Sequence, residues 1–226
     1  VRECMFNTGQ SCDAPTRLLV ERSCYGEALR IAKQTADSIT VGDPTQEGDH
    51  IGPLFDKIQY DRVQAMIKVG LAEGATLLAG GPGRPEGLAK GWFVKPTIFA
   101  DVSNDMRIAQ EEIFGPVLHV VRWDGDPLSV VREINALGYG LTMGIQTRID
   151  SRAQAMARAA HVGNCYVNRN QIGAVVGVQP FGGEGLSGTG PKAGGPHYLL
   201  KFASERTLTI NTTAAGGNAS LLTLSE

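Results

Sequence analysis

The sequence has no long apolar run and no cluster of basic residues. No segment of the 226 residues approaches the roughly 18 apolar residues of a transmembrane helix. The 21 Lys and Arg residues are spread along the chain and balanced by 23 Asp and Glu residues. With 42% hydrophobic residues, the composition is typical of a soluble globular protein. We therefore expect neither a membrane span nor a nucleic-acid partner.

Cysteine and histidine are scarce and dispersed. The cysteines form no C-x-x-C pair, and no export signal is recognisable, so we expect free thiols in a reducing cytoplasm rather than disulfides. The four histidines are too far apart for a local zinc motif, and no Walker-type phosphate loop is present. The sequence therefore does not predict a metal site. The four cysteines are Cys4, Cys12, Cys24 and Cys165.

Glycine, in contrast, is abundant. The 29 glycines are about 13% of the chain, against a usual share of about 7%, and nine of them lie within residues 173–195, which read GAVVGVQPFGGEGLSGTGPKAGG. A flexible linker is poor in aliphatic residues. Because aliphatic residues alternate with these glycines, we expect an ordered, packed loop whose backbone amides face a substrate. The interleaved apolar residues are Val175, Val176, Val178, Phe181 and Leu186.

The hydrophobic periodicity predicts an α/β fold with an open, mostly parallel, twisted sheet and flanking helices. Short apolar runs alternate with segments of helical period, several of which end at glycine. The strand with Pro96 is expected at a sheet edge, and Ser23 is expected to cap the first long helix. The predicted strands are 17–21, 75–79, 92–99, 117–123, 141–147 and 165–168, and the predicted helices are 23–39, 57–73, 127–137 and 151–160.

A further strand is expected over residues 206–213, RTLTINTT, apart from the alternating β and α segments. It can pair within the chain or with the edge of another subunit.

The string from Gly183 to Gly188 matches the dinucleotide fingerprint G-x-G-x-x-G, with Glu205 about 20 residues later. The fingerprint needs a helix directly after it. Pro191 and Pro196 do not allow that helix. We interpret this string as unrelated to cofactor binding.

Cys12 follows a glycine-containing turn and precedes a predicted strand. A cysteine in this position can lie at the floor of a cleft, with its own backbone N–H free to donate to an oxyanion. The alternative is a small buried hydrophobic residue, which is the common role of an arbitrary cysteine.

Three motifs resemble, in order and spacing, those of the aldehyde dehydrogenase superfamily, and the resemblance covers nearly the whole chain. Gly9, Gln10 and Cys12 match the segment of the nucleophilic cysteine. The residues 111–116, EEIFGP, match the cofactor motif, and residues 180–188 match a C-terminal loop of the family.

The resemblance implies that the Cys12 thiolate attacks an aldehyde, that a hydride passes to NAD, and that water releases a carboxylate. It also implies that Glu112 binds the nicotinamide ribose and that Phe114 packs on the nicotinamide end. Arg62 stands where the family often has lysine. It is either a contact to the other ribose or an ordinary exposed helix residue. NADP is not excluded as the cofactor.

The chain after Gly115 resembles the 1-pyrroline-5-carboxylate dehydrogenase part of bifunctional proline-utilisation proteins. The resemblance implies that L-glutamate γ-semialdehyde is the substrate and that the backbone amides around Gly194 and Gly195 hold its carboxylate. It further implies that the terminal strand and tail, residues 204–226, take part in forming a homo-oligomer.

Asp13 departs from this pattern, because proline-pathway enzymes usually carry serine there. A carboxylate at this position would repel a substrate carboxylate by roughly 4 kcal/mol at 4 Å with an effective dielectric constant near 20. The chain up to Phe114 instead resembles aldehyde dehydrogenases of broad substrate range. Either Asp13 points away from the substrate, or the substrate is another aldehyde.

Family members carry a dinucleotide-binding domain, a general-base glutamate and an oxyanion asparagine before the cysteine. We expect residues 1–203 to form the catalytic domain without this upstream half, and the chain alone to be inactive. A different alternative is a non-catalytic assembly module.

Overall fold

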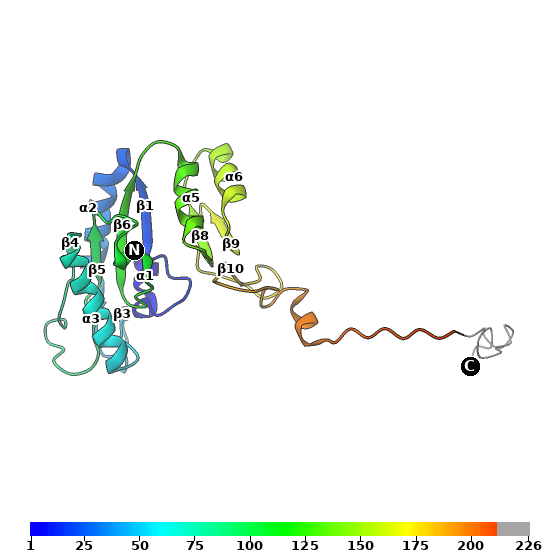
Figure 1. Ribbon diagram of the computed structural model, residues 1–226. Coiled ribbons are helices and arrows are strands. Elements are labelled where there is room, and N and C mark those ends of the chain that lie inside the picture. The colour runs from blue at the N-terminus through cyan, green and yellow to red at the C-terminus, as the bar shows by residue number, and fades with distance from the viewer. Residues whose placement is uncertain (212–226) are drawn as a thin grey trace.

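A computed structural model describes residues 1–211, which form two α/β units joined side by side (Figure 1). The larger unit contains a four-stranded sheet in the order β1-β6-β5-β4. Strands β1 and β5 run parallel to β6, and only β4 is antiparallel to its neighbour. The predicted α/β class with a mostly parallel sheet is confirmed. The strands are β1 Arg17–Glu21, β4 Thr76–Ala79, β5 Thr97–Ala100 and β6 Val117–Trp123.

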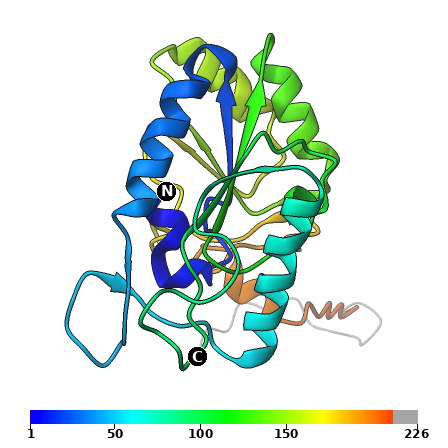
Figure 2. The same cartoon turned by 90° about the vertical axis from the view of Figure 1, so that its left-hand side faces the viewer.

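Helices α2 (Tyr25–Asp37) and α3 (Lys57–Ala72) cover opposite faces of this sheet (Figure 2). Strand β6 is buried on both faces, since Leu118 packs on the α2 side and Val117 on the α3 side. A central parallel strand needs apolar residues at every position, because each face meets a helix. The β6 sequence VLHVVRW meets this need almost throughout.

The smaller unit is a second layer of strands and helices. Its parallel pair consists of β8 (Thr142–Ile145) and β9 (Asn164–Val167), covered by α5 (Pro127–Ala136) and α6 (Asp150–Ala159). The remaining elements are α1 Arg2–Met5, η1 Phe6–Gly9, η2 Arg22–Cys24, β2 Thr40–Val41, β3 His50–Ile51, α4 Arg107–Gln110, β7 Tyr139–Gly140, β10 Glu184–Gly185 and η3 Tyr198–Phe202. No helix within residues 1–211 is long and apolar enough to cross a membrane.

Local residues explain where the helices begin and end. The Asp56 carboxylate caps α3 by accepting from the Gln59 N–H at 2.7 Å. Asp126 caps α5 in the same way, and Pro127 occupies the first turn, where its missing N–H costs nothing. Gly74, with φ of +89°, follows α3 and provides the left-handed conformation that ends it.

Two expectations about element ends are wrong. Ser23 does not cap α2, because its hydroxyl lies 3.2 Å from the Glu21 carboxylate and the helix starts after a 3-10 turn. The strand expected from Trp92 begins only at Thr97, directly after Pro96. This strand, β5, lies inside the sheet between β6 and β4 and not at the expected edge. Pro96 does not prevent this position, because it precedes the strand and removes none of the strand's ladder hydrogen bonds.

The glycine-rich segment is ordered, but its aliphatic side chains are not packed as expected. Val176, Val178 and Leu186 are 84%, 75% and 71% exposed. Backbone contacts shape the segment instead, including bridges from Val175 to Gln179 and from Phe181 to Ala193.

The strand expected over 206–213 is not found among residues 203–211, which have no regular secondary structure and lead away from both units (Figure 1). Residues 212 and 213 lie outside the described part of the chain.

Candidate active site

Cys12 is exposed on the turn between η1 and β1. Three residues before this turn take left-handed backbone conformations, with φ of 49° at Asn7, 58° at Thr8 and 69° at Gly9. Such a conformation costs about 1–3 kcal/mol for a residue other than glycine. Buried Thr8 offsets the cost by donating its hydroxyl to the Gly52 carbonyl at 3.0 Å. The segment that leads to Cys12 is therefore held in one unusual conformation.

The cysteine segment and the segment EEIFGP meet through their backbones. A Cβ atom at Gly9 would lie 2.1 Å from the carbonyl oxygen of Gly115, and one at Gly115 would lie 2.7 Å from Val63 of α3. Only glycine fits at either position. Two motifs about 100 residues apart in the sequence are thus brought into direct contact.

The Cys12 sulfur faces two carboxylates. Burial of the thiol raises its pKa, and the charges of Asp13 and Glu112 raise it further. The backbone N–H groups of Cys12 and Asp13 donate to the sulfur and oppose this effect. The arrangement favours the protonated thiol within this chain. Because the Cys12 N–H points to the sulfur, it also provides a donor next to any atom bonded there.

The Asp13 side chain accepts a hydrogen bond from the Ser11 hydroxyl at 2.5 Å. The backbone carbonyl oxygen of Asp13 accepts from the Gln171 side-chain amide at 3.4 Å, and the same amide group lies 3.4 Å from the Thr142 hydroxyl of β8. Gln171 therefore ties the cysteine turn to the smaller unit. Sequence reasoning missed Gln171, because a contact between segments 158 residues apart has no local sequence signal.

A cavity of about 420 Å³ lies against Cys12. The glycine-rich segment forms most of its wall, and Lys201 contributes a cation. Ala193 lines the cavity, whereas Gly194 and Gly195 are not among its lining residues. The Gly195 N–H donates to the Lys192 carbonyl at 3.1 Å. The Gly194 N–H has no acceptor within residues 1–211 and is the freer of the two predicted carboxylate donors.

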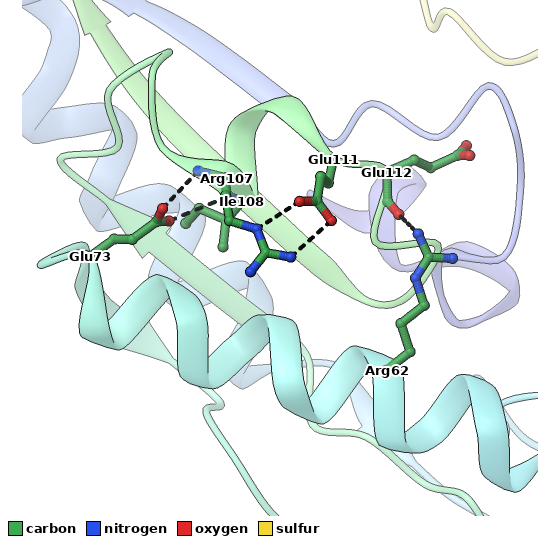
Figure 3. A network of polar contacts seen from close by, with 6 residues as sticks. All are labelled: Arg62, Glu73, Arg107, Ile108, Glu111 and Glu112. Carbon is green, nitrogen blue, oxygen red and sulfur yellow. Dashed lines mark hydrogen bonds and ion pairs between the residues drawn. The ribbon is translucent and has the colours of Figure 1, made fainter.

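A second cavity, of about 600 Å³, lies against Phe114. Arg62 donates to the backbone carbonyl of Glu112 at 2.6 Å, and the Glu112 carboxylate extends away from Arg62 (Figure 3). The cavity is lined by three apolar side chains, three side-chain amides and one carboxylate: Asn7, Gln10, Phe55, Asp56, Ile58, Gln59 and Phe114. Residues of the cysteine segment thus border both cavities. Sequence reasoning missed Gln59, whose signal was its place one turn before Arg62 on the same helix.

Comparison with known proteins gives consistent relatives. The profile of the aldehyde dehydrogenase family matches residues 1–208. The bifunctional protein PutA of Klebsiella aerogenes is 42% identical over 204 residues, which are 88% of this chain and 15% of PutA. The 3-succinoylsemialdehyde-pyridine dehydrogenase of a Pseudomonas species is 43% identical over 195 residues, 86% of this chain and 40% of that protein.

A solved structure of 1-pyrroline-5-carboxylate dehydrogenase from Thermus, with bound NAD, is 40% identical with a TM-score of 0.82. The match covers 88% of this chain and 38% of that one. The chain therefore spans between 15% and 40% of the length of these three proteins.

Proposed function

The chain belongs to the aldehyde dehydrogenase family, and on that premise we propose that it supplies the nucleophile for NAD-dependent oxidation of an aldehyde to a carboxylate. The observation that carries the proposal is the position of Cys12. It borders a cavity beside the glycine-rich segment, and its own segment packs against EEIFGP through Gly9 and Gly115.

The cavity at Phe114 fits a nicotinamide ring and its ribose. Phe55 and Ile58 are 86% and 78% exposed, which offers apolar surface to a flat ring, and the Asn7 and Gln10 amides provide polar contacts. Glu112 and Phe114 would hold the ribose and the nicotinamide end, as predicted from the sequence. When bound, NAD supplies the hydride acceptor.

The Cys12 sulfur would attack the aldehyde carbon, and the oxygen of the resulting thiohemiacetal would accept from the Cys12 N–H. Loss of the carbon-bound hydrogen as hydride leaves a thioester on Cys12. Water then cleaves this thioester, which restores the thiol and releases the carboxylate.

The raised pKa of Cys12 supports the proposal that the chain works with a further segment. The attacking species is the thiolate, so a base must remove the proton that partial burial, Asp13 and Glu112 favour on the sulfur. In our proposal, a dinucleotide-binding half contributes that base, the second oxyanion donor and the sites for the rest of NAD.

L-Glutamate γ-semialdehyde is the substrate we favour. The similarity to PutA and to 1-pyrroline-5-carboxylate dehydrogenase supports it. The similarity to 3-succinoylsemialdehyde-pyridine dehydrogenase favours the rival, an enzyme for other aldehydes.

The test uses the chain joined to a dinucleotide-binding half. Glutamate semialdehyde is compared with an uncharged aldehyde of similar length, and Cys12→Ser is the control, expected to lower kcat at least about a thousandfold. A higher kcat/KM for glutamate semialdehyde supports the carboxylate anchor, whereas equal values contradict it. A fully active Cys12→Ser variant would contradict the nucleophile itself, whereas a joined parent protein that oxidises neither aldehyde would favour the assembly module.

A further inference from the structure

Residues 107–116 lie along α3 (Figure 3). The C-terminal end of α3 holds the start of this segment. The Glu73 carboxylate accepts from the backbone N–H of Arg107 at 2.8 Å and from that of Ile108 at 3.5 Å. The Arg107 guanidinium then donates twice to Glu111, at 2.6 and 3.2 Å. The helical turn α4 is thus attached to α3, directly before residues 112–114, which we call the Glu112 loop.

The end of the segment is held by two side chains of the same helix. Arg62 donates to the carbonyl of Glu112 at 2.6 Å, and the Gln59 amide donates to the carbonyls of Ile113 at 3.0 Å and Phe114 at 2.8 Å. Gln59 and Arg62 are one turn apart, so they share a face of α3. Three successive carbonyls therefore take their hydrogen bonds from side chains rather than from a helix or a strand.

These bonds act on a strained stretch of backbone. Phe114 has φ of +56°, a left-handed conformation that strains a bulky residue and persists only where neighbours enforce it. The Gln59 bond to the Phe114 carbonyl is the nearest enforcing contact, and Gly115 next to it packs on Val63.

We propose that Gln59 and Arg62 are positioning residues, which act on the cofactor through the Glu112 loop by holding the Glu112 carboxylate and the Phe114 ring in place. The inference rests on the proposed function for the identity of the ligand. It gives Arg62 a role different from a direct ribose contact and from an ordinary exposed helix residue. The direction of the Glu112 side chain, away from Arg62, agrees with it.

The geometry is tested on the chain itself by NMR. Arg62→Met removes the donor to Glu112, and Gln59→Glu removes both amide donors with little change of shape. We expect the backbone carbonyl resonances of residues 112–114 to shift in these variants. Lys68→Met, an exposed cation of the same helix, is the matched control and should leave them in place. Unchanged resonances in correctly folded variants would overturn the inference.

The consequence is tested in the active protein that includes a dinucleotide-binding half. Arg62→Met should raise the KM for NAD about fivefold, the factor for one lost hydrogen bond of about 1 kcal/mol, with a smaller change in kcat. Gln59→Glu loses two hydrogen bonds and should raise the KM for NAD by at least as much. Arg62→Lys retains a donor and should recover most of the loss.

A double-mutant cycle separates positioning from direct contact. If Arg62 acts through Glu112, then Arg62→Met should have little further effect in a Glu112→Gln background. Multiplying effects would show a direct contact and overturn the positioning role. A parent protein with no NAD-dependent activity would contradict the proposed function, while the NMR result would still decide the geometry.

Discussion

A single methyl group at residue 9 has no space in this fold. It would lie 2.1 Å from the Gly115 carbonyl oxygen, and φ of +69° adds strain for any residue with a Cβ. We expect Gly9→Ala to lower the free energy of unfolding by roughly 2–4 kcal/mol, measured by urea denaturation. Gly26→Ala on α2 is the control, because nothing lies within 4 Å of the added methyl. It should raise stability by up to about 0.5 kcal/mol, and equal losses in both variants would contradict the packing argument.

The charge of Asp13 makes a second prediction at the scale of one residue. A negative charge near the sulfur disfavours the thiolate, so Asp13→Asn should lower the pKa of Cys12 and move its alkylation to lower pH. The rate is followed by mass spectrometry between about pH 7 and 10, with Cys24 as the internal reference. An unchanged pH profile would show that the Asp13 carboxylate does not act on the thiol.

His119 of β6 predicts acid sensitivity. It is 3% exposed, and neither ring nitrogen has a hydrogen-bond partner in the described chain. Burial, aided by the charge of Arg17, lowers its pKa to about 4. The unfolded chain takes up the proton near pH 6.5, whereas the folded chain does so only near pH 4. As the pH is lowered from about 6.5 to 4, the free energy of unfolding should therefore fall by roughly 3 kcal/mol.

His119→Leu should remove this part of the pH dependence of the free energy of unfolding. Urea denaturation at about pH 6.5 and pH 4 measures the difference. His161→Gln changes an exposed histidine and should leave the dependence as in the parent. If His119→Leu is as acid-sensitive as the parent, other groups cause the loss.

At the scale of single elements, the Asp56 cap at the start of α3 should contribute more to the free energy of unfolding than the ion pair on the surface of the helix. Asp56→Ala removes the cap and should cost about 1 kcal/mol of unfolding free energy. Asp61→Ala breaks the pair with Lys57, whose side chains are more than half exposed, and should cost at most about 0.5 kcal/mol. Thermal unfolding compares the two, and a larger effect of Asp61→Ala would contradict the ranking.

Most helices and strands were predicted from the sequence, because hydrophobic periodicity and helix-capping residues are local properties. β1 and β6 were predicted with their observed bounds, since continuous apolar runs between turn residues are typical of buried strands. The position of β5 inside the sheet was missed, because strand order depends on contacts between distant segments. The bonds from Gln59 and Arg62 to backbone carbonyls were missed for a related reason: carbonyl acceptors are the same at every residue.

At the scale of the whole molecule, apolar side chains gather near the C-terminal end of the described chain. Leu199, Leu200 and Phe202 are 77%, 66% and 75% exposed. Exposed apolar clusters of this kind mark contact surfaces, so we expect the chain to self-associate.

Sedimentation equilibrium tests this expectation. Replacing Leu199 and Phe202 together by serine should shift the chain toward the monomer. Ile31→Ser, which changes an exposed apolar residue of α2, should not do so. Association that survives the double replacement would place the contact elsewhere.

The contact between Gly9 and Gly115 has a consequence for exchanging parts between relatives. It consists of backbone atoms with no side chain on either glycine, so it places no demand on the composition of the flanking segments. From the sequence, we expect the part of the chain before Phe114 to follow broad-range aldehyde dehydrogenases and the part after Gly115 to follow proline-pathway enzymes. A chimaera joined between Cys12 and Asp56, which takes α3 and residues 107–116 from one parent, should therefore assemble the same site from either parent, as long as both glycines are retained.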